Sequence, residues 1–237
     1  MIETILFDLD GTLLPMEQEN FVKAYFGSLA KKLAPYGFAP EKLVESIWAG
    51  MKAMVTNSTE EKNEARWWET FDAYFGELSH KHRSVLEEYY AKDFDKVRHS
   101  CGHNPAAAEL VRELKARGYR VVLATNPVFP AMATEQRAGW AGLNIADFDL
   151  ITTYENSTRC KPNPEYYTEI LTKIGAKAEE CMMVGNDVAE DMIAETLGMK
   201  VFLLTDNLLN KKELDISTYR KGSFGELLEY INELENT

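Results

Sequence analysis

A short apolar segment at the start of the chain, residues 2–7, ends abruptly at Asp8 and leads into Asp10 and Gly11. An apolar run of this length that stops at a turn signal is typical of a strand buried in a sheet. Asp8 and Asp10 are two residues apart, so their side chains leave an extended backbone on the same side. The segment therefore predicts a buried strand that presents two neighbouring carboxylates at its carboxyl end.

The chain from residue 104 onwards alternates between strand-like and helix-like segments. The strand-like segments are 119–124, 149–152, 181–184 and 200–204, and the helix-like segments are 106–117, 131–138, 164–174, 189–197 and 224–234. Strands that alternate with helices predict a parallel sheet covered on both faces. We therefore expect an α/β fold with a Rossmann-like parallel sheet as its core.

Between residues 17 and 94 the spacing of apolar residues becomes helical. Four groups recur every three to four residues: Phe21, Tyr25, Leu29 and Leu33; Leu43, Ile47 and Met51; Trp67, Phe71 and Phe75; and Val85, Leu86 and Tyr89. This pattern predicts a bundle of about four helices inserted after the first strand. The expected domains are an α/β core of residues 1–15 and 104–237 and a helical domain of residues 16–103.

The composition narrows the class of protein. The formal net charge is -12, which disfavours binding to nucleic acid or to an anionic membrane. Three widely spaced cysteines do not form a disulfide framework and fit a reducing compartment. The N-terminus lacks the features of a signal peptide, and no uncharged apolar run approaches the roughly 18 residues of a membrane span. We therefore expect a cytoplasmic protein, and the sequence does not indicate its oligomeric state.

Polar side chains follow several of the expected strands at the point where each strand ends. They are Asp8 and Asp10, Thr125 and Asn126, and Asn186, Asp187 and Asp191, with Lys161 in a loop that leads into a helix. In open α/β sheets, ligands bind at the carboxyl ends of the strands. We therefore expect these carboxylates, one hydroxyl and one lysine to converge at one edge of the sheet.

This set of side chains points to phosphoryl transfer. Gathered carboxylates repel one another, and Mg²⁺, which is held by few carboxylates plus water and a substrate phosphate, removes that repulsion. A lysine and a hydroxyl complete a cradle for the phosphoryl oxygens. Asp8, as a carboxylate nucleophile, would form an aspartyl-phosphate. Asp10 would protonate the leaving oxygen and later accept a proton from the attacking water.

With these residues identified, the chain resembles the haloacid dehalogenase superfamily of phosphohydrolases over essentially its whole length. Four motifs in order carry the resemblance: residues 8–12 (DLDGT), the strand end at 123–126 (LATN), Lys161 within 160–164 (CKPNP), and residues 184–191 (VGNDVAED). Each motif alone has an ordinary explanation, such as an Asp-Gly turn or a surface lysine. The resemblance therefore depends on the four together.

The resemblance implies a role for each residue and one cofactor, Mg²⁺. Asp8 resembles the nucleophile and a metal ligand, and Asp10 the acid/base whose backbone carbonyl also binds the metal. Thr125, Lys161 and the backbone of Asn126 resemble the phosphate-binding groups. The remaining three roles concern the metal: Asp187 as a direct ligand, and Asn186 and Asp191 as outer-sphere residues or alternative ligands. The insert, residues 16–103, resembles the mobile cap domain of the family.

Several other residues could be taken for substrate-binding or metal-binding groups, but their spacing in the sequence does not favour such roles. The aromatic residues of the insert fit the core of the bundle better than a stacking platform; they are Trp67, Trp68, Phe71, Tyr74 and Phe75. Trp67 and Trp68 are adjacent and cannot both face one core directly, which leaves one of them available to the cleft. The spacing of His80 and His82 disfavours a metal site. We interpret Cys101 and His103 as parts of a linker.

The leading hypothesis is a magnesium-dependent phosphatase that acts on a small phosphorylated metabolite. A phosphomutase is the main alternative, since the same aspartyl-phosphate can return its phosphoryl group to a sugar. A phosphonate hydrolase would need a lysine of the insert near the cleft, for which Lys52 is available. A dehalogenase fits less well because that branch lacks the second aspartate, here Asp10. A non-catalytic binding protein would be expected to have lost one of the motif residues.

Overall fold

The computed structural model describes residues 1–235, and six parallel strands form its single sheet in the order β3-β2-β1-β4-β5-β6. The strands are β1 (Thr4–Phe7), β2 (Arg120–Leu123), β3 (Leu150–Ile151), β4 (Cys181–Gly185), β5 (Lys200–Leu204) and β6 (Lys221–Gly222). β1 lies between β2 and β4, and all of its residues are buried. Its central place puts Asp8 beside the carboxyl ends of both neighbours.

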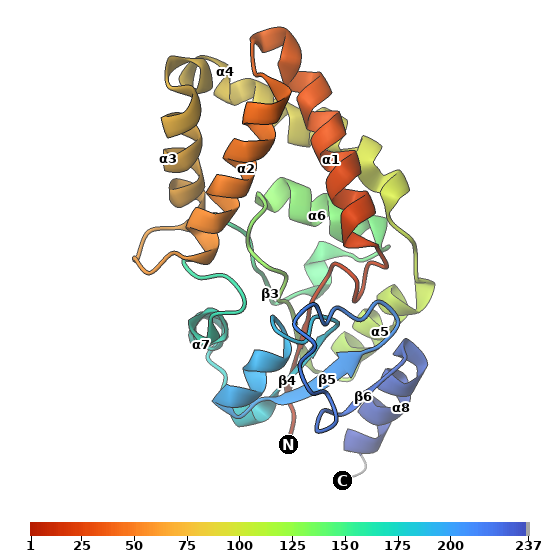
Figure 1. Cartoon of the computed structure of the whole chain (residues 1–237). Coiled ribbons are helices and arrows are strands. Elements are labelled where there is room, and N and C mark those ends of the chain that lie inside the picture. The colour runs from red at the N-terminus through yellow and green to blue at the C-terminus, as the bar shows by residue number, and fades with distance from the viewer. Residues whose placement is uncertain (236–237) are drawn as a thin grey trace.

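Helices cover the two faces of the sheet, because successive side chains of each strand point to opposite faces. On one face, Ile5 and Phe7 pack in one apolar cluster with α5 (Pro105–Ala116) and α8 (Phe224–Glu235). On the other, Leu6 packs in a second cluster with α7 (Pro164–Ile174) and the 3₁₀ helix η6 (Met192–Leu197). Figure 1 shows α7 and α8 on opposite sides of the strands. The predicted Rossmann-like α/β fold is confirmed.

A bundle of four helices stands beyond the carboxyl edge of the sheet, on the side away from the N-terminus (Figure 1). It consists of α1 (Gln18–Leu33), α2 (Pro40–Val55), α3 (Asn63–Phe75) and α4 (Glu77–Glu88). We call these four helices the helical bundle. The apolar positions with helical spacing are buried here, as Phe21, Tyr25, Leu29 and Leu33 show for α1. α4 continues into a π-helix, η2 (Tyr89–Asp93), and a 3₁₀ helix, η3 (Phe94–Ser100).

The chain leaves the sheet and returns to it at adjacent points. Met16 forms an antiparallel bridge with Cys101, and the amide of Gly102 donates to the carbonyl of Pro15 at 2.7 Å. A Cβ atom on Gly102 would lie 3.1 Å from Cβ of Pro15, so a residue without a side chain suits this close approach. The two linkers are therefore paired, and Cys101 belongs to one of them. The domain division at residues 15/16 and 103/104 stays a prediction.

The first third of one predicted helix, residues 189–197, is wrong. Residues 189–191 form a turn, and only Met192–Leu197 is helical, as a 3₁₀ helix. Asp187 Oδ1 accepts the amides of Ala189 and Glu190, as at a helix start, and the amide of Asp191 donates to the carbonyl of Asp187 at 2.9 Å. Asp191 Oδ2 then accepts the amide of Asp187, so the segment closes as one turn before the 3₁₀ helix begins.

The remaining predicted elements agree with the structure to within a few residues. The helix at 131–138 is α6 (Ala131–Trp140), and short 3₁₀ turns occur at η1 (Ala34–Tyr36), η4 (Ile145–Asp147) and η5 (Ala178–Glu180). The two-residue strand β6 was not predicted, because Lys221-Gly222 carries no apolar pattern. Among residues 1–235, no helix combines the length and apolarity that crossing a membrane requires.

Candidate active site

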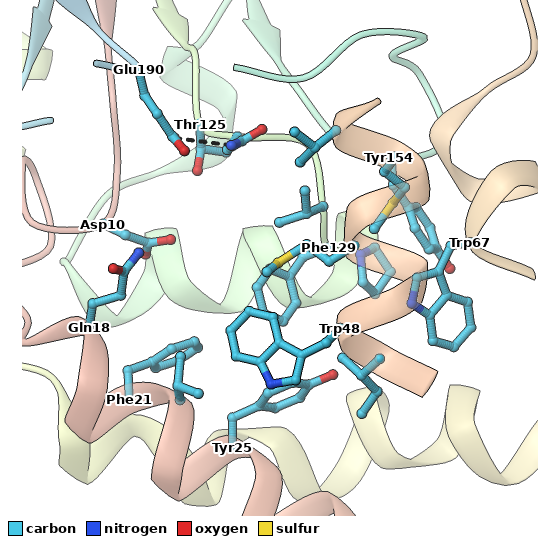
Figure 2. A pocket seen from close by; sticks show the side chains of 18 of the residues that line it. Asp10, Gln18, Phe21, Tyr25, Trp48, Trp67, Thr125, Phe129, Tyr154 and Glu190 are labelled. Carbon is cyan, nitrogen blue, oxygen red and sulfur yellow. Dashed lines mark hydrogen bonds between the residues drawn. The ribbon is translucent and has the colours of Figure 1, made fainter. Parts of the chain in front are cut away.

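A cavity of about 650 Å³ lies between the carboxyl edge of the sheet and the helical bundle. Most of the predicted site residues line its sheet side: Asp8, Asp10, Thr125, Asn126, Asn186, Asp187 and Asp191. Figure 2 shows Asp10, Thr125 and Glu190 on this side, facing aromatic side chains that include Trp48 and Tyr25. Residues far apart in the sequence therefore meet in one cavity, because parallel strands end at the same edge.

Asp8 is the first residue after β1 and is 8% exposed. Its amide donates to the carbonyl of Val184 at 2.9 Å, which ties it to the end of β4. Its two carboxylate oxygens have different partners: Oδ1 accepts from Lys161 Nζ at 2.9 Å, and Oδ2 accepts from Thr12 Oγ1 at 3.3 Å. The carboxylate is thus held in one orientation with one edge toward the cavity.

The turn after Asp8 depends on Gly11. Its φ is +90°, a conformation that disfavours other residues, and a Cβ atom there would lie 2.3 Å from Nδ2 of Asn186. Asn186 in turn accepts from Thr12 Oγ1 at 3.1 Å and donates to the carbonyl of Asn207 at 2.7 Å. Asn186 therefore packs against the turn that carries Asp8 and Asp10, and Thr12 links it to the Asp8 carboxylate.

Asp10 faces the cavity and forms an ion pair with Arg137 of α6 through its Oδ2. Arg137 is 1% exposed, and its guanidinium also lies 4.5 Å from the ring centroid of Phe129. Removal from bulk water raises the pKa of Asp10 above its ordinary value; Arg137 opposes that shift, and the charge of Asp8 adds to it. A carboxyl group with a raised pKa can carry the proton that a general acid needs.

Lys161 is 1% exposed and lies beneath the floor of the cavity. Its ammonium group contacts two carboxylates, Asp8 Oδ1 at 2.9 Å and Asp191 Oδ1 at 2.6 Å. Burial lowers the pKa of Lys161, but Asp191 and Asp8 more than offset this, so the pKa lies well above its ordinary value. Lys161 is therefore a fixed positive charge. Its loop is ended by Asn163, whose side chain accepts from the amide of Glu165 and begins α7.

Thr125 and Asn126 follow β2. The carbonyl of Thr125 accepts from Thr152 Oγ1 at 2.6 Å and from the Tyr166 hydroxyl at 2.9 Å, so the backbone is held while the side chain lines the cavity. Asn126 Nδ2 donates to Glu190 at 3.0 Å, the contact drawn in Figure 2. Burial, with neighbouring carboxylates such as Asp191, raises the pKa of Glu190 to about 8, although Lys161 opposes the shift.

Asp187 and Asp191 occupy different positions in the site. Asp187 lines the cavity, and its Oδ1 accepts two backbone amides at 2.8 and 3.0 Å. Asp191 is 1% exposed and is bound to Lys161. It lies so close to Gly185 that a Cβ atom on that glycine would be 2.1 Å from its Oδ2. Asp191 therefore supports Lys161, whereas Asp187 lines the cavity and has no part in that ion pair.

The donor set suits a hard divalent cation. Within residues 1–235, no three His, Cys, Asp or Glu side chains converge as a fully protein-bound metal would require. Mg²⁺ needs less, because it keeps several waters and uses one or two carboxylates. Asp8 and Asp187 place carboxylate groups on the cavity wall, where they could serve as oxygen ligands. Asp10 Oδ1 is buried and has no hydrogen-bond partner among the described residues. A water or ion in the cavity would satisfy that atom.

The helical bundle supplies the apolar wall of the cavity. Trp67 and Trp68 both line it, whereas Phe71 and Phe75 pack inside the bundle 4.9 Å apart. Both tryptophans also belong to the apolar core, Trp67 as a buried member and Trp68 packed against it, so four of the five predicted aromatics are core residues. The cleft receives both tryptophans rather than one. Lys52 is exposed, and the described lining of the cavity does not include it.

Three contributors to the site were not predicted from the sequence. Trp48 is 45% exposed although it is large and apolar, and it lines the cavity. Glu190 binds Asn126. Arg137 pairs with Asp10, and the available signal was its place on the apolar side of α6, four residues after the buried Ala133. A charged residue at such a position needs a buried partner.

Comparison with known proteins gives a consistent result. A family model described as haloacid dehalogenase-like hydrolase matches residues 2–194. A pyrophosphatase, PpaX of Bacillus cereus (strain G9842), is 27% identical over 218 residues, which are 90% of this chain and 88% of that protein.

Two solved structures resemble the whole chain. A 2-haloacid dehalogenase from Pseudomonas syringae pv. Tomato DC3000 has a TM-score of 0.67 at 19% identity and covers 99% of this chain and 100% of its own. A HAD phosphatase from Thermococcus onnurineus has a TM-score of 0.60 at 21% identity, and the match covers 97% of this chain and 98% of that protein. At these identities the likeness shows a shared fold.

Proposed function

Because this chain belongs to the haloacid dehalogenase-like hydrolase family, we propose that it is a magnesium-dependent phosphatase of a small phosphorylated metabolite. One observation carries the proposal. Asp8 and Asp10 line the same cavity, Asp8 is oriented by Lys161, and Asp10 is oriented by Arg137. A nucleophile and an acid/base with separate cationic partners are what two-step phosphoester hydrolysis requires.

In the first step, a carboxylate oxygen of Asp8 attacks phosphorus, and the bond between phosphorus and the leaving oxygen breaks. Asp10 gives its proton to that oxygen, which departs as an alcohol. In the second step, water attacks phosphorus, Asp10 takes a proton from it, and the bond to Asp8 breaks. Asp8 and inorganic phosphate are released, and Asp10 is protonated again.

The phosphate cradle consists of Thr125, the backbone of Asn126, and Lys161. Thr125 lines the cavity beside Asp8, and Lys161 supplies a fixed positive charge under the Asp8 carboxylate. These groups would hold the transferring oxygens and offset their charge.

The residues proposed to hold Mg²⁺ are the carboxylates of Asp8 and Asp187 and the backbone carbonyl of Asp10. When bound, the ion would neutralise charge on the phosphoryl oxygens and between the carboxylates. Asn186 and Asp191 are proposed to act one contact further out, because their side chains are engaged with Thr12 and Lys161.

We further propose that residues 16–103 form the cap that selects the substrate and that the core comprises residues 1–15 and 104–237. The paired linkers at Pro15 and Gly102 support this division, since within residues 1–235 the chain passes between the two parts there. A cytoplasmic location is supported by the thiols of Cys101, Cys160 and Cys181, which are free.

The test is phosphate release from para-nitrophenyl phosphate and from a panel of phosphorylated metabolites, with Mg²⁺ and with a chelator. We expect turnover that the chelator abolishes. Absence of turnover on every phosphoester in the presence of Mg²⁺ would refute the phosphatase proposal. Interconversion of sugar phosphate isomers with little free phosphate would instead identify a phosphomutase. The phosphonate alternative loses its support, because Lys52 is exposed rather than in the cleft.

A further inference from the structure

The cavity wall that faces Asp8 and Asp10 is apolar and rich in aromatic side chains. On the bundle side these include Phe21 and Tyr25 of α1 and Trp48 of α2, and on the sheet side Phe129 of the loop after β2. Figure 2 shows Trp48 in the middle of this set, between Tyr25 and Phe129. A cavity of about 650 Å³ has the size of a typical small-molecule site and exceeds what a phosphate group alone requires.

Trp48 is the residue whose placement most needs an explanation. It is 45% exposed, and the only ring contact described for it is an edge-to-face contact with Phe26 at 5.5 Å. The neighbouring aromatics are buried; Phe21 is 4% and Tyr25 5% exposed. An indole left open toward a cavity is a ready surface for a flat apolar group, because stacking removes apolar area of both partners from water.

The charges of the same wall disfavour a second anion. Glu64 of α3 and Glu87 of α4 line the cavity together with Glu155, whose carboxylate accepts from the amide of Ala131. Among the described lining residues, Lys211 is the only lysine, arginine or histidine, and its ammonium group donates to Gln18 Oε1 at 2.8 Å. A second phosphate or a carboxylate would therefore enter among like charges with one engaged cation to receive it.

We infer that the substrate is a phosphate monoester of a neutral, largely apolar alcohol or phenol of one or two rings, whose rings lie against Trp48. This inference rests on the proposed phosphatase function. The phosphate would occupy the Asp8 end of the cavity and the rings the aromatic end. Substrates whose leaving group is itself anionic, such as pyrophosphate or phosphoglycolate, are disfavoured by the acidic wall.

The first test is a comparison of kcat/KM for 1-naphthyl phosphate, pyrophosphate, phosphoglycolate and O-phosphoethanolamine. We expect 1-naphthyl phosphate to exceed each of the others by at least tenfold. Trp48→Ala should lower kcat/KM for 1-naphthyl phosphate about tenfold, chiefly by raising KM. The same substitution should change kcat/KM for methyl phosphate by less than about twofold. Tyr36→Ala is the matched control, because Tyr36 is an exposed aromatic of the bundle region, at 37%, that lies outside the cavity lining; it should change neither.

A binding measurement separates this inference from the proposed function. Calorimetry with Mg²⁺ present would compare 1-naphthylmethylphosphonate with phosphonoacetate, neither of which the mechanism can hydrolyse. We expect the naphthyl compound to bind at least tenfold more tightly and Trp48→Ala to remove most of that difference. Selective binding without turnover of any ester would refute the phosphatase and support the aromatic site.

The reverse pattern would overturn the inference and leave the phosphatase intact. One such outcome is efficient turnover with a higher kcat/KM for pyrophosphate or phosphoglycolate than for 1-naphthyl phosphate. The other is a Trp48→Ala variant whose kcat/KM for 1-naphthyl phosphate equals that of the parent protein. Preference for O-phosphoethanolamine would also overturn it, because recognition would then lie with the carboxylates rather than with the rings.

Discussion

At the scale of single residues, each of the two carboxylates proposed to be catalytic has its own buried cation. Lys161 contacts Asp8, and Arg137 contacts Asp10. The two cations reach the site from different elements, the loop before α7 and helix α6. The two carboxylates are therefore held in different orientations although they are two residues apart. Under the proposed mechanism, this allows Asp8 to attack while Asp10, whose pKa is raised by burial, carries a proton.

Replacing Asp8 tests its role as the nucleophile most directly. In Asp8→Asn the amide oxygen can still accept from Thr12 or Lys161, so the fold should survive while the attacking carboxylate is lost. We expect kcat to fall by at least about 10³-fold, measured as phosphate release, with an unchanged melting curve by circular dichroism. Asp215→Asn, at an exposed position, is the control and should retain full activity. Normal turnover by Asp8→Asn would remove Asp8 from its assigned role.

Arg137 is predicted to position Asp10 and to set its pKa. Arg137→Met keeps much of the side-chain volume but removes the charge that opposes the raised pKa of Asp10. The pKa of Asp10 should then rise further, so the low-pH limb of kcat should move to higher pH, because the second step needs the ionised carboxylate. We expect kcat to fall by about tenfold to a hundredfold with KM little changed, read from a pH profile.

Two comparisons make the Arg137 prediction specific. Arg137→Lys retains a cation and should restore part of the rate and of the original pH profile. Arg112→Met alters an exposed arginine of α5 and should leave both unchanged. A loss of activity in Arg137→Met without any shift of the pH profile would indicate a purely structural role.

At the scale of elements, hydrogen bonds at the start of α3 join the helical bundle to loops at the carboxyl edge of the sheet. The amide of Asn63 donates to the carbonyl of Ser157 at 2.9 Å, and its side chain donates to the carbonyls of Pro127 and Arg159 at 3.3 Å. Asn57 Nδ2 reaches the carbonyl of Thr158 at 2.8 Å. These contacts fall on the loops that carry Asn126 and Lys161. The bundle is therefore joined to the sheet at the site itself as well as at the paired linkers.

Removing this polar contact should destabilise the protein. Asn63 is fully buried, so Asn63→Ala leaves buried carbonyl groups without their donor. We expect the free energy of unfolding to fall by about 1–3 kcal/mol, measured by urea denaturation. The control is Asn20→Ala, since Asn20 is exposed and bonds only to the neighbouring Glu17 among the contacts described for it. Equal stability of the two variants would show that the Asn63 contacts contribute little.

Elements with strong periodic patterns could be predicted from the sequence, and elements decided by side-chain bonds could not. The apolar spacing of α1 and the run of β1 reflect burial of whole faces, which one-dimensional patterns record. Residues 189–191 follow the same helical pattern, yet they form one turn that Asp191 closes by accepting the amide of Asp187. Such a turn depends on a local geometry that residue spacing does not contain.

The candidate site likewise contains residues that could be predicted from the sequence and residues that could not. Asp8, Thr125 and Asp187 could be predicted to line one cavity because parallel strands bring their carboxyl ends together. Arg137 and Trp48 could not, because their significance depends on which side of α6 and α2 faces the sheet after the bundle has folded back over it. Helix faces that pack against a distant element are set by tertiary contacts rather than by the helix's own pattern.

At the scale of the whole molecule, negative charge is concentrated where the proposed cation would bind. The chain carries a net charge of -12, and four of its carboxyl groups line the sheet side of one cavity, those of Asp8, Asp10, Asp187 and Glu190. Close carboxylates raise one another's pKa and destabilise the folded state at neutral pH. Mg²⁺ that binds the folded state alone should therefore stabilise the entire protein.

The expected size of that stabilisation follows from mass action. Mg²⁺ at about 100 times its Kd should add about 2.7 kcal/mol, which for a chain of this length corresponds to a rise in Tm of about 5–10 °C. Differential scanning fluorimetry with Mg²⁺ and with a chelator measures this rise, and NaCl at matched ionic strength should produce a much smaller one, because screening is not coordination. Asp187→Asn should weaken the Mg²⁺ effect, whereas Asp215→Asn should not. A rise that NaCl reproduces, or that survives in Asp187→Asn at low Mg²⁺, would place the ion elsewhere than at the carboxyl edge of the sheet.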